Sequence, residues 1–323
     1  VLDEVYRNID LEKTYFIIPN QRAKIFLKKE ILKKISVASI SPQIFSIDAF
    51  IEKIADIKES PRTNQLFYLY ECYMELSQKK DFEAYSLFRK WSNTLLNDIN
   101  DIDMAMADYN VVFENLYQIH KLEAITDEEA EKKLAFWSMI PNIVKSFKAR
   151  LIKNNTYSKG ICHVFAKENI DMFSNANQDF SFIFLGLNSL SNNEEFIVSY
   201  LLENNKSQIF WDCDESFIKN HEHEAGLYFR KYINEWNYYK TNKFNWQQSL
   251  LSTPKNIFIY ETTKQIAQVK TAANLVQEIF KNKSKDKTAI ILPNQELLKP
   301  LISSMPKSID NLSLSISNPL INM

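Results

Sequence analysis

One stretch decides the predicted fold: SFIFLGLNSLSNNEEFIVSYLLENNKSQIFWDCDES, residues 181–216. The apolar run Ser181–Gly186 is typical of a buried parallel strand, and Ser207–Trp211 is typical of a second one. Between them, Ser191 and Glu194 form a capping box that begins a helix. Strand, helix and strand over this length make a βαβ unit, which predicts a parallel sheet with a right-handed crossover.

The loops at the carboxyl ends of these strands are where an open parallel sheet binds its ligands. Gly186-Leu187-Asn188 follows the first strand, and Asp212-Cys213-Asp214 follows the second. A nucleotide-hydrolysing motor places its magnesium-holding acidic pair after the first of these strands. The first loop has no carboxylate, and the two aspartates stand on the next strand. The sequence therefore predicts a parallel sheet that lacks the acidic residue such a motor needs after this strand.

The composition limits the function classes. The 323 residues allow two or three domains, and only three of them are glycine, which disfavours a glycine-rich phosphate loop. The net charge of −1 excludes a strong electrostatic binder of nucleic acid over the whole chain. Three distant cysteines indicate reduced thiols of a cytoplasmic protein, and no apolar stretch is long enough for a membrane span. We expect no bound cofactor.

Two further strands and three helices are predicted before residue 58. The strands are Thr14–Pro19 and Ile44–Ser46; the helices are an amphipathic one over Val1–Glu12, one from Arg22 to about Ile35, and one capped by Asp48 that ends at Ile57. The second helix is basic, with Arg22, Lys24, Lys28, Lys29, Lys33 and Lys34 against Glu30. It is either a solvated face or a phosphate contact near the helix N-terminus, where the dipole favours anions.

Residues 58–159 show helical periodicity and dense aromatic residues, which predicts an all-helical insertion. Pro141 is expected to start or bend its last long helix, Asn142–Asn154. Three aspartates, Asp98, Asp101 and Asp103, resemble a metal cluster, but we expect them to cap helices around a turn because they lack EF-hand spacing.

From Gly160 the α/β pattern resumes, with a predicted helix over Asn220–Trp236. His221 and His223 suggest zinc, but two residues two positions apart point to different sides of a helix. The polar stretch Thr241–Pro254 is a plausible domain boundary.

The last part of the chain repeats the first. TAIILPNQ, residues 288–295, echoes YFIIPNQ, residues 15–21, and both predict a strand that leads into a helix. Further strands are predicted at Ile257–Tyr260 and Leu312–Ile316, and a helix at Thr263–Phe280. We expect this second α/β core to be partial and the chain to be a fragment of a longer protein.

Several stretches resemble the N-terminal half of AddB-like proteins, which belong to the PD-(D/E)XK nuclease family. They include TYFIIPNQRAKIFLKKEI (14–31), FRKWSNTLLNDINDIDMAMAD (88–108), FIFLGLNSLSNNEEFIV (182–198) and HEAGLYFRKYINEW (223–236). The resemblance implies a P-loop-NTPase-like, superfamily 1 helicase-like fold. Residues 1–57 and 160–250 would form the first α/β core, 58–159 its helical insertion, and 251–323 part of a second core. The nuclease domain would lie further C-terminal.

We expect an inactivated helicase-like region that binds DNA and acts as a scaffold in double-strand-break processing. The residues expected to contact DNA are Asn20, Gln21, Arg22, Lys24, Ser46, Asn188, Asn294 and Gln295. One alternative is a docking module for a partner helicase subunit, with little DNA contact. Another is an active ATP-dependent helicase whose phosphate loop precedes Val1.

Overall fold

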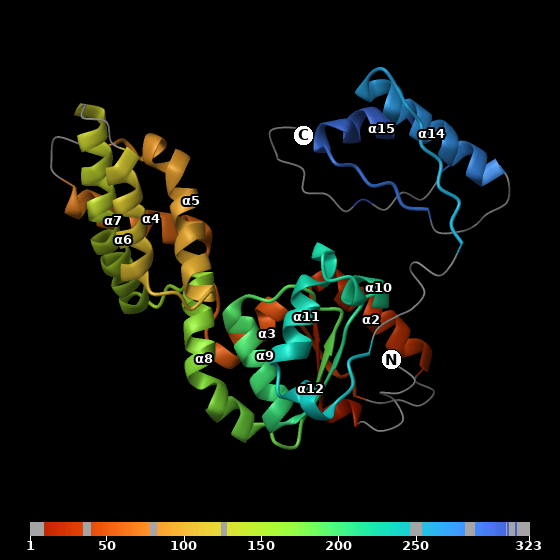
Figure 1. The fold of residues 1–323 in the computed structure, drawn as a ribbon, viewed down its shortest axis with the longest axis horizontal. Helices are drawn as coiled ribbons and strands as arrows, with labels where there is room; N and C mark the ends of the chain where they lie inside the picture. Colours follow the sequence, from red (N-terminus) through yellow and green to blue (C-terminus); the bar gives the residue numbers. More distant parts are fainter. Residues whose placement is uncertain are drawn as a thin grey trace. The chain divides into compact units, whose positions relative to one another are not determined.

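The computed structural model describes residues 10–34, 40–77, 83–123, 128–245, 254–281 and 288–307, with Ile309 and Leu314. For residues 122, 123 and 128–133, only the backbone is described. The chain divides into two compact units, Val1–Thr253 and Pro254–Met323 (Figure 1), and the division falls within the polar stretch 241–254. Among the described residues, no helix is both long and apolar enough to cross a membrane.

The first unit is built on a four-stranded parallel sheet, as predicted. Its strands are β1 (Thr14–Ile18), β2 (Gln43–Ser46), β3 (Ser181–Leu185) and β4 (Lys206–Phe210), in the order β2-β1-β3-β4. All three pairings are parallel. Helix α9 (Asn192–Asn204) connects β3 to β4 and begins with the predicted capping box of Ser191 and Glu194.

Helices cover both faces of this sheet, because alternate strand residues point to opposite sides. On one face, α2 (Gln21–Lys34) buries Ile31 against Phe16, Ile18, Ile44 and Ile183. On the other face, Tyr15, Ile17, Phe182 and Phe184 pack with α3 (Ile47–Ala55), α8 (Lys159–Ala176) and α9 (Figure 1). One prediction here is wrong: Ser46, not Asp48, caps α3, since its side chain accepts from the Ala49 N–H.

The predicted helix over Asn220–Trp236 is shorter than expected and begins later, because its range contains η2 (Glu224–Gly226) and α11 (Leu227–Glu235). Helix α10 (Glu215–Lys219) precedes this range and α12 (Tyr238–Thr241) follows it. The guanidinium of Arg230 donates to the carbonyls of Phe217, Asn220 and His223. Because these carbonyls are satisfied by a side chain, the turn between α10 and α11 does not need helical hydrogen bonds.

The predicted insertion contains four helices and, in its described residues, no strand. They are α4 (Arg62–Leu76), α5 (Tyr85–Met104), α6 (Tyr109–Glu123) and α7 (Glu128–Lys153), with a core of their own. Pro141 lies inside α7, so the helix starts well before the proline. The three aspartates do not cap a turn, because they lie within the last turns of α5, where Leu95, Leu96 and Ile99 keep the helix packed.

The second unit contains α14 (Gln265–Lys281), η3 (Gln295–Leu297) and α15 (Leu298–Ser304), and α14 matches the predicted helix. The predicted strands at 257–260 and 288–292 are wrong, because neither segment forms a strand. A strand needs a hydrogen-bonded neighbour, and the described residues supply none; Ile259 is 93% exposed. Most of Leu312–Ile316 and most of Val1–Glu12 lie outside the described residues, so the predictions there stay untested, and Leu11–Lys13 forms the short helix η1.

The junction between the insertion and the sheet region depends on a close helix crossing. Asp103 of α5 is buried and binds the Lys148 ammonium at 2.6 Å. The N–H of Gly160, in the first turn of α8, donates to the Asn100 side chain at 2.8 Å. A Cβ at position 160 would lie 2.7 Å from Asp103 Oδ2 and 3.0 Å from the Asn100 Cα. Only glycine therefore lets α8 approach α5 this closely.

We expect Gly160→Ala to destabilise the protein by about 1–3 kcal/mol, the usual cost of inserting a methyl group into a packed site. Thermal unfolding followed by circular dichroism measures the change. Glu168→Ala, on an exposed position of the same helix, is the control and should unfold close to wild type. Equal melting temperatures for Gly160→Ala and wild type would contradict the close-crossing account.

Candidate functional site at the carboxyl edge of the sheet

The carboxyl ends of the parallel strands meet at one edge, and most of the predicted site residues lie there. Gln21 follows β1 and donates from Nε2 to the hydroxyl of Ser46 at the end of β2, at 3.0 Å. Ser46 is buried and also caps α3, so it positions Gln21 and offers no exposed surface of its own. The structure thus brings two of the predicted residues into contact and gives each a structural partner.

Asn20 and Asn294 both cap the start of a helix, which explains the repeated Pro-Asn-Gln motif. The Asn20 side chain accepts from the Ala23 N–H at 3.0 Å, at the start of α2. The Asn294 side chain accepts from the Glu296 N–H at 2.9 Å, at the start of η3. Both asparagines begin a helix. Asn294 and the exposed Gln295 belong to the second unit.

Helix α2 carries a row of basic residues away from this edge. Arg22, Lys28 and Lys29 are exposed and Lys24 is half-buried, and none of them forms an ion pair among the described residues. Lys33 instead binds Glu30 at 2.6 Å. Large apolar side chains are exposed beside these cations: Ile25, Phe26 and Leu32. The exposed side of α2 is therefore both basic and apolar.

A tyrosine hydroxyl group holds the loop after β3 in place. Gly186 has a φ of +63°, a backbone conformation that favours glycine, and turns the chain out of the strand. The buried Tyr232 hydroxyl accepts from the Leu190 N–H at 2.9 Å and lies 3.3 Å from the Asn188 carbonyl. Burial raises the pKa of Tyr232, so its hydroxyl keeps its proton. This contact fixes the backbone that presents the exposed Asn188 side chain.

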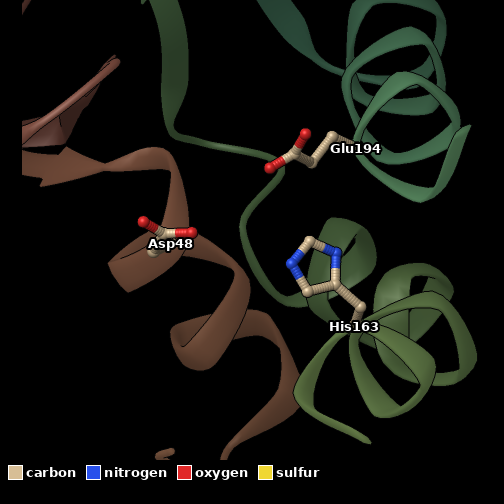
Figure 2. A group of neighbouring side chains, drawn as sticks. All are labelled: Asp48, His163 and Glu194. Atoms are coloured by element: carbon tan, nitrogen blue, oxygen red, sulfur yellow. The ribbon is translucent and has the colours of Figure 1, made fainter. Parts of the chain in front are cut away.

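Three side chains from three different helices form a cluster at the same edge (Figure 2). Asp48 lies in the first turn of α3, which follows β2; Glu194 lies in the first turn of α9, which follows β3; and His163 lies near the start of α8. Each offers a nitrogen or carboxylate oxygen, and these three atoms lie within 4.8 Å of one another. We call this group the Asp48–His163–Glu194 cluster.

His163 is the buried member of the cluster. Its side chain is 1% exposed, and neither ring nitrogen has a hydrogen-bond partner. Burial lowers the pKa of His163, and Lys159 acts in the same direction, against the charges of Glu194 and Asp48 and the neighbouring amide of Asn193. The imidazole is therefore held neutral, the form in which it binds metals. Asn193, fully buried beside it, also has no partner for its amide oxygen or nitrogen.

Lys159 is the cation nearest this cluster. Its ammonium lies 2.8 Å from Asp48 Oδ1. Burial disfavours the charge on Lys159, but the hydrogen bond to Asp48 and the nearby carboxylates outweigh it and raise its pKa. A cavity of about 20 Å³ lies between Asp48, Glu52, Glu59, Lys159 and His163. That volume holds one water molecule or one ion.

The other metal hypotheses find no support in the described residues, where the cluster is the group with metal-binding geometry. Asp98 and Asp101 are exposed on α5, and Asp103 binds Lys148. His223 Nδ1 accepts from the Ala225 N–H at 3.2 Å and so caps η2. After β4, Asp212 is exposed and Asp214 caps α10, so the two acidic residues there have separate environments.

A larger apolar cavity, of about 770 Å³, lies in the helical insertion. Its walls are mostly aromatic and aliphatic, with three carboxylates among them: Tyr73, Glu83, Trp91, Thr94, Leu95, Asp98, Asp101, Ile102, Val112, Phe113, Leu116, Phe136, Trp137 and Ile140. Glu83 accepts from the Trp91 indole N–H at 2.9 Å. Burial and the charge of the neighbouring Asp101 raise the pKa of Asp98.

No protein-family model and no curated protein matches this chain. The resemblance to AddB-like proteins stays a prediction from the quoted motifs. The structure supports the coarser statement, a mixed α/β fold with a parallel sheet and mostly helical content.

Sequence reasoning missed the cluster because its members are far apart in the chain. The sequence predicts helix-capping roles for Asp48 and Glu194, which is right for Glu194 but does not place either residue beside His163. His163 is one of four histidines, and that rarity was the one available signal. The large cavity is likewise formed by residues from four helices that no sequence period brings together.

The Tyr232 contact makes a prediction about the loop after β3. Tyr232→Phe leaves the buried Leu190 N–H without its partner and should lower the free energy of unfolding by about 1–3 kcal/mol. It should also speed amide exchange in residues 187–190. Tyr228→Phe, the same change at an exposed position of α11, is the control. Unchanged exchange in Tyr232→Phe would show that the loop is held by other contacts.

Proposed function

We propose that the chain is a helicase-like DNA-binding and scaffolding region without ATP hydrolysis of its own, in a break-processing nuclease of the AddB-like kind. The observation that carries this proposal is the exposed side of α2. This helix leaves the carboxyl edge of the sheet, where ligands of open α/β folds bind. Arg22, Lys24, Lys28 and Lys29 form no ion pair among the described residues and can bind phosphates.

The arrangement of side chains on α2 favours a single strand. Arg22, Phe26 and Lys29 follow one another at helical spacings of four and three, so they lie along one side. Over 14 residues the helix is about 21 Å long, enough for several phosphates. Phe26 is 58% exposed and offers a face on which a base can stack. Such contacts bind without sequence preference.

The absence of motor chemistry in the proposal rests on the loops at the sheet edge. The loop after β1 is Pro19-Asn20-Gln21, and its side chains begin α2 and bind Ser46. The loop after β3 contains Gly186, Leu187 and Asn188, with no carboxylate for magnesium. The nuclease activity of the whole protein follows from the resemblance, and the location in the cytoplasm follows from the three distant cysteines. Both are parts of the same proposal.

A docking role for a partner helicase subunit is the second candidate, and the large apolar cavity favours it. Exposed apolar cavities of this size mark sites for ligands or partner side chains. Asp98 and Asp101 stand at its wall without an ion-pair partner among the described residues. The cavity therefore fits a partner segment that presents aromatic or aliphatic anchors next to a lysine or arginine.

We expect the chain to bind a single-stranded oligonucleotide weakly at low salt. Arg22→Ala with Lys29→Ala should lower the affinity and flatten the salt slope by about 1.4, since each phosphate contact contributes about 0.7 on a log–log plot. Fluorescence anisotropy over a salt series measures both. Lys153→Ala with Lys206→Ala, at exposed positions outside α2, is the charge-matched control. ATP and Mg²⁺ should leave the affinity unchanged; equal slopes for both double variants would rule out α2 as the DNA contact.

The docking candidate makes a separate prediction. Asp98→Asn with Asp101→Asn should weaken co-elution with the helicase subunit of the same complex by about tenfold, because a desolvated charge pair at an interface is lost. Trp137→Ala should also weaken co-elution, because it removes part of the apolar wall of the cavity. Glu168→Gln with Glu203→Gln, on exposed positions of α8 and α9, is the control. If the cavity variants co-elute like wild type, the cavity is not the docking site.

A further inference from the structure

We propose that the Asp48–His163–Glu194 cluster is a binding site for one divalent transition-metal ion, Zn²⁺ or Mn²⁺. Three protein atoms of the right chemistry lie within 4.8 Å of one another. In a metal site with bonds of about 2.1 Å, ligand atoms lie between about 3 and 4.2 Å apart. Small side-chain movements therefore close the cluster around an ion. Figure 2 shows the three side chains converging on one space.

The independent observation is the unsatisfied imidazole. Buried polar groups nearly always have a hydrogen-bond partner, and leaving one without a partner costs about 1–3 kcal/mol. Both nitrogens of His163 lack one, although the side chain is 1% exposed and faces two carboxylates. A metal ion bound to one nitrogen removes this cost. The side chain of Asn193, whose amide is also unpartnered, lies beside the ring and can orient it.

In each carboxylate, one oxygen already binds a neighbouring group and the other is available to a ligand. Glu194 Oε2 accepts from the N–H and hydroxyl of Ser191, at 2.8 and 3.0 Å. Asp48 Oδ1 binds the Lys159 ammonium. The other oxygen of each group is left for a ligand. The capping box holds Glu194 in place before any ion arrives, which lowers the cost of forming the site.

The donor set selects the class of ion. One imidazole nitrogen with two carboxylate oxygens suits Zn²⁺ and Mn²⁺, whereas Ca²⁺ and Mg²⁺ prefer oxygen alone. Three protein ligands leave further positions for water, and the exposed side of Asp48 opens these to solvent. The ion would tie together α3, α8 and α9, and so would fasten the first helix after the insertion to the sheet edge.

Lys159 is the group that opposes metal binding. Its ammonium occupies one oxygen of Asp48 and repels a second cation nearby. Glu52 and Glu59 also line the small cavity and leave the region acidic despite Lys159. Removing the lysine should therefore strengthen binding at this site, whereas removing a ligand should weaken it. These opposite effects distinguish the site from a chance surface contact.

The test is calorimetric titration of the metal-free chain with ZnCl₂ and with MnCl₂. One ion per chain is expected, with His163→Gln and Glu194→Gln each lowering the affinity at least about tenfold. Lys159→Met should raise it several-fold. His221→Gln, an exposed histidine, is the control. Mn²⁺ electron paramagnetic resonance should show nitrogen coupling that disappears in His163→Gln. Circular dichroism confirms that each variant is folded.

Two results would overturn the proposal. One is no binding of either ion by wild type at millimolar concentration. The other is binding that His163→Gln and Lys159→Met leave unchanged, which would place the ion elsewhere on the surface. Because Lys159→Met removes no ligand, a gain of affinity in this variant supports the site even if His163→Gln fails to fold.

Discussion

The pairing of β1 with β3 is the constraint on which the first unit depends. It joins Thr14–Ile17 to Ser181–Phe184, across more than 160 residues of chain. The whole helical insertion lies within the loop that this pairing closes. Loop-closure entropy grows slowly with length, so the added residues cost little if they fold by themselves. The four helices of the insertion bury most of their apolar side chains in a core apart from the two faces of the sheet, to which α8 adds Ile161. Aromatic stacking strengthens the pairing, since the Tyr15 ring lies 5.3 Å from Phe182 and 4.9 Å from Phe180.

The same pairing determines where the carboxyl edge of the sheet, with its candidate functional site, lies. Once β1 and β3 run parallel, the loops after both strands open at one end, and β2 adds a third loop beside β1. The side chains at the starts of the following helices therefore lie at this edge: Gln21, Ser46 and Glu194. Helix α8 brings His163 to this edge only because Gly160 lets it cross α5 closely. A single glycine in the insertion junction thus affects the position of a histidine at the sheet edge.

Local patterns predicted the sheet well, because each strand is a short apolar run followed by a helix start that the sequence displays. Ser181–Leu185 and the capping box of Ser191 and Glu194 are such cases. The failures involve information that is not local. Ile257–Tyr260 has strand-forming side chains, but a strand exists only with a neighbour, and none is present among the described residues. Asp103 looks like a helix-capping residue until tertiary packing brings Lys148 to it. Of the candidate site, the edge loops were predictable from topology, whereas the cluster around His163 required the fold.

A net charge of −1 suggests little about binding, because it averages two regions of opposite sign that the fold keeps apart. The cations of α2 lie over one face of the sheet, with Ile31 anchoring the helix there. The carboxylates near His163 belong to helices on the other face, α3 and α9. Because the two sets of charges stand on helices over opposite faces of the sheet, one small domain can present both a basic helix and an acidic cluster. The composition of the chain excludes a uniformly basic DNA-binding surface, but it does not exclude a local one.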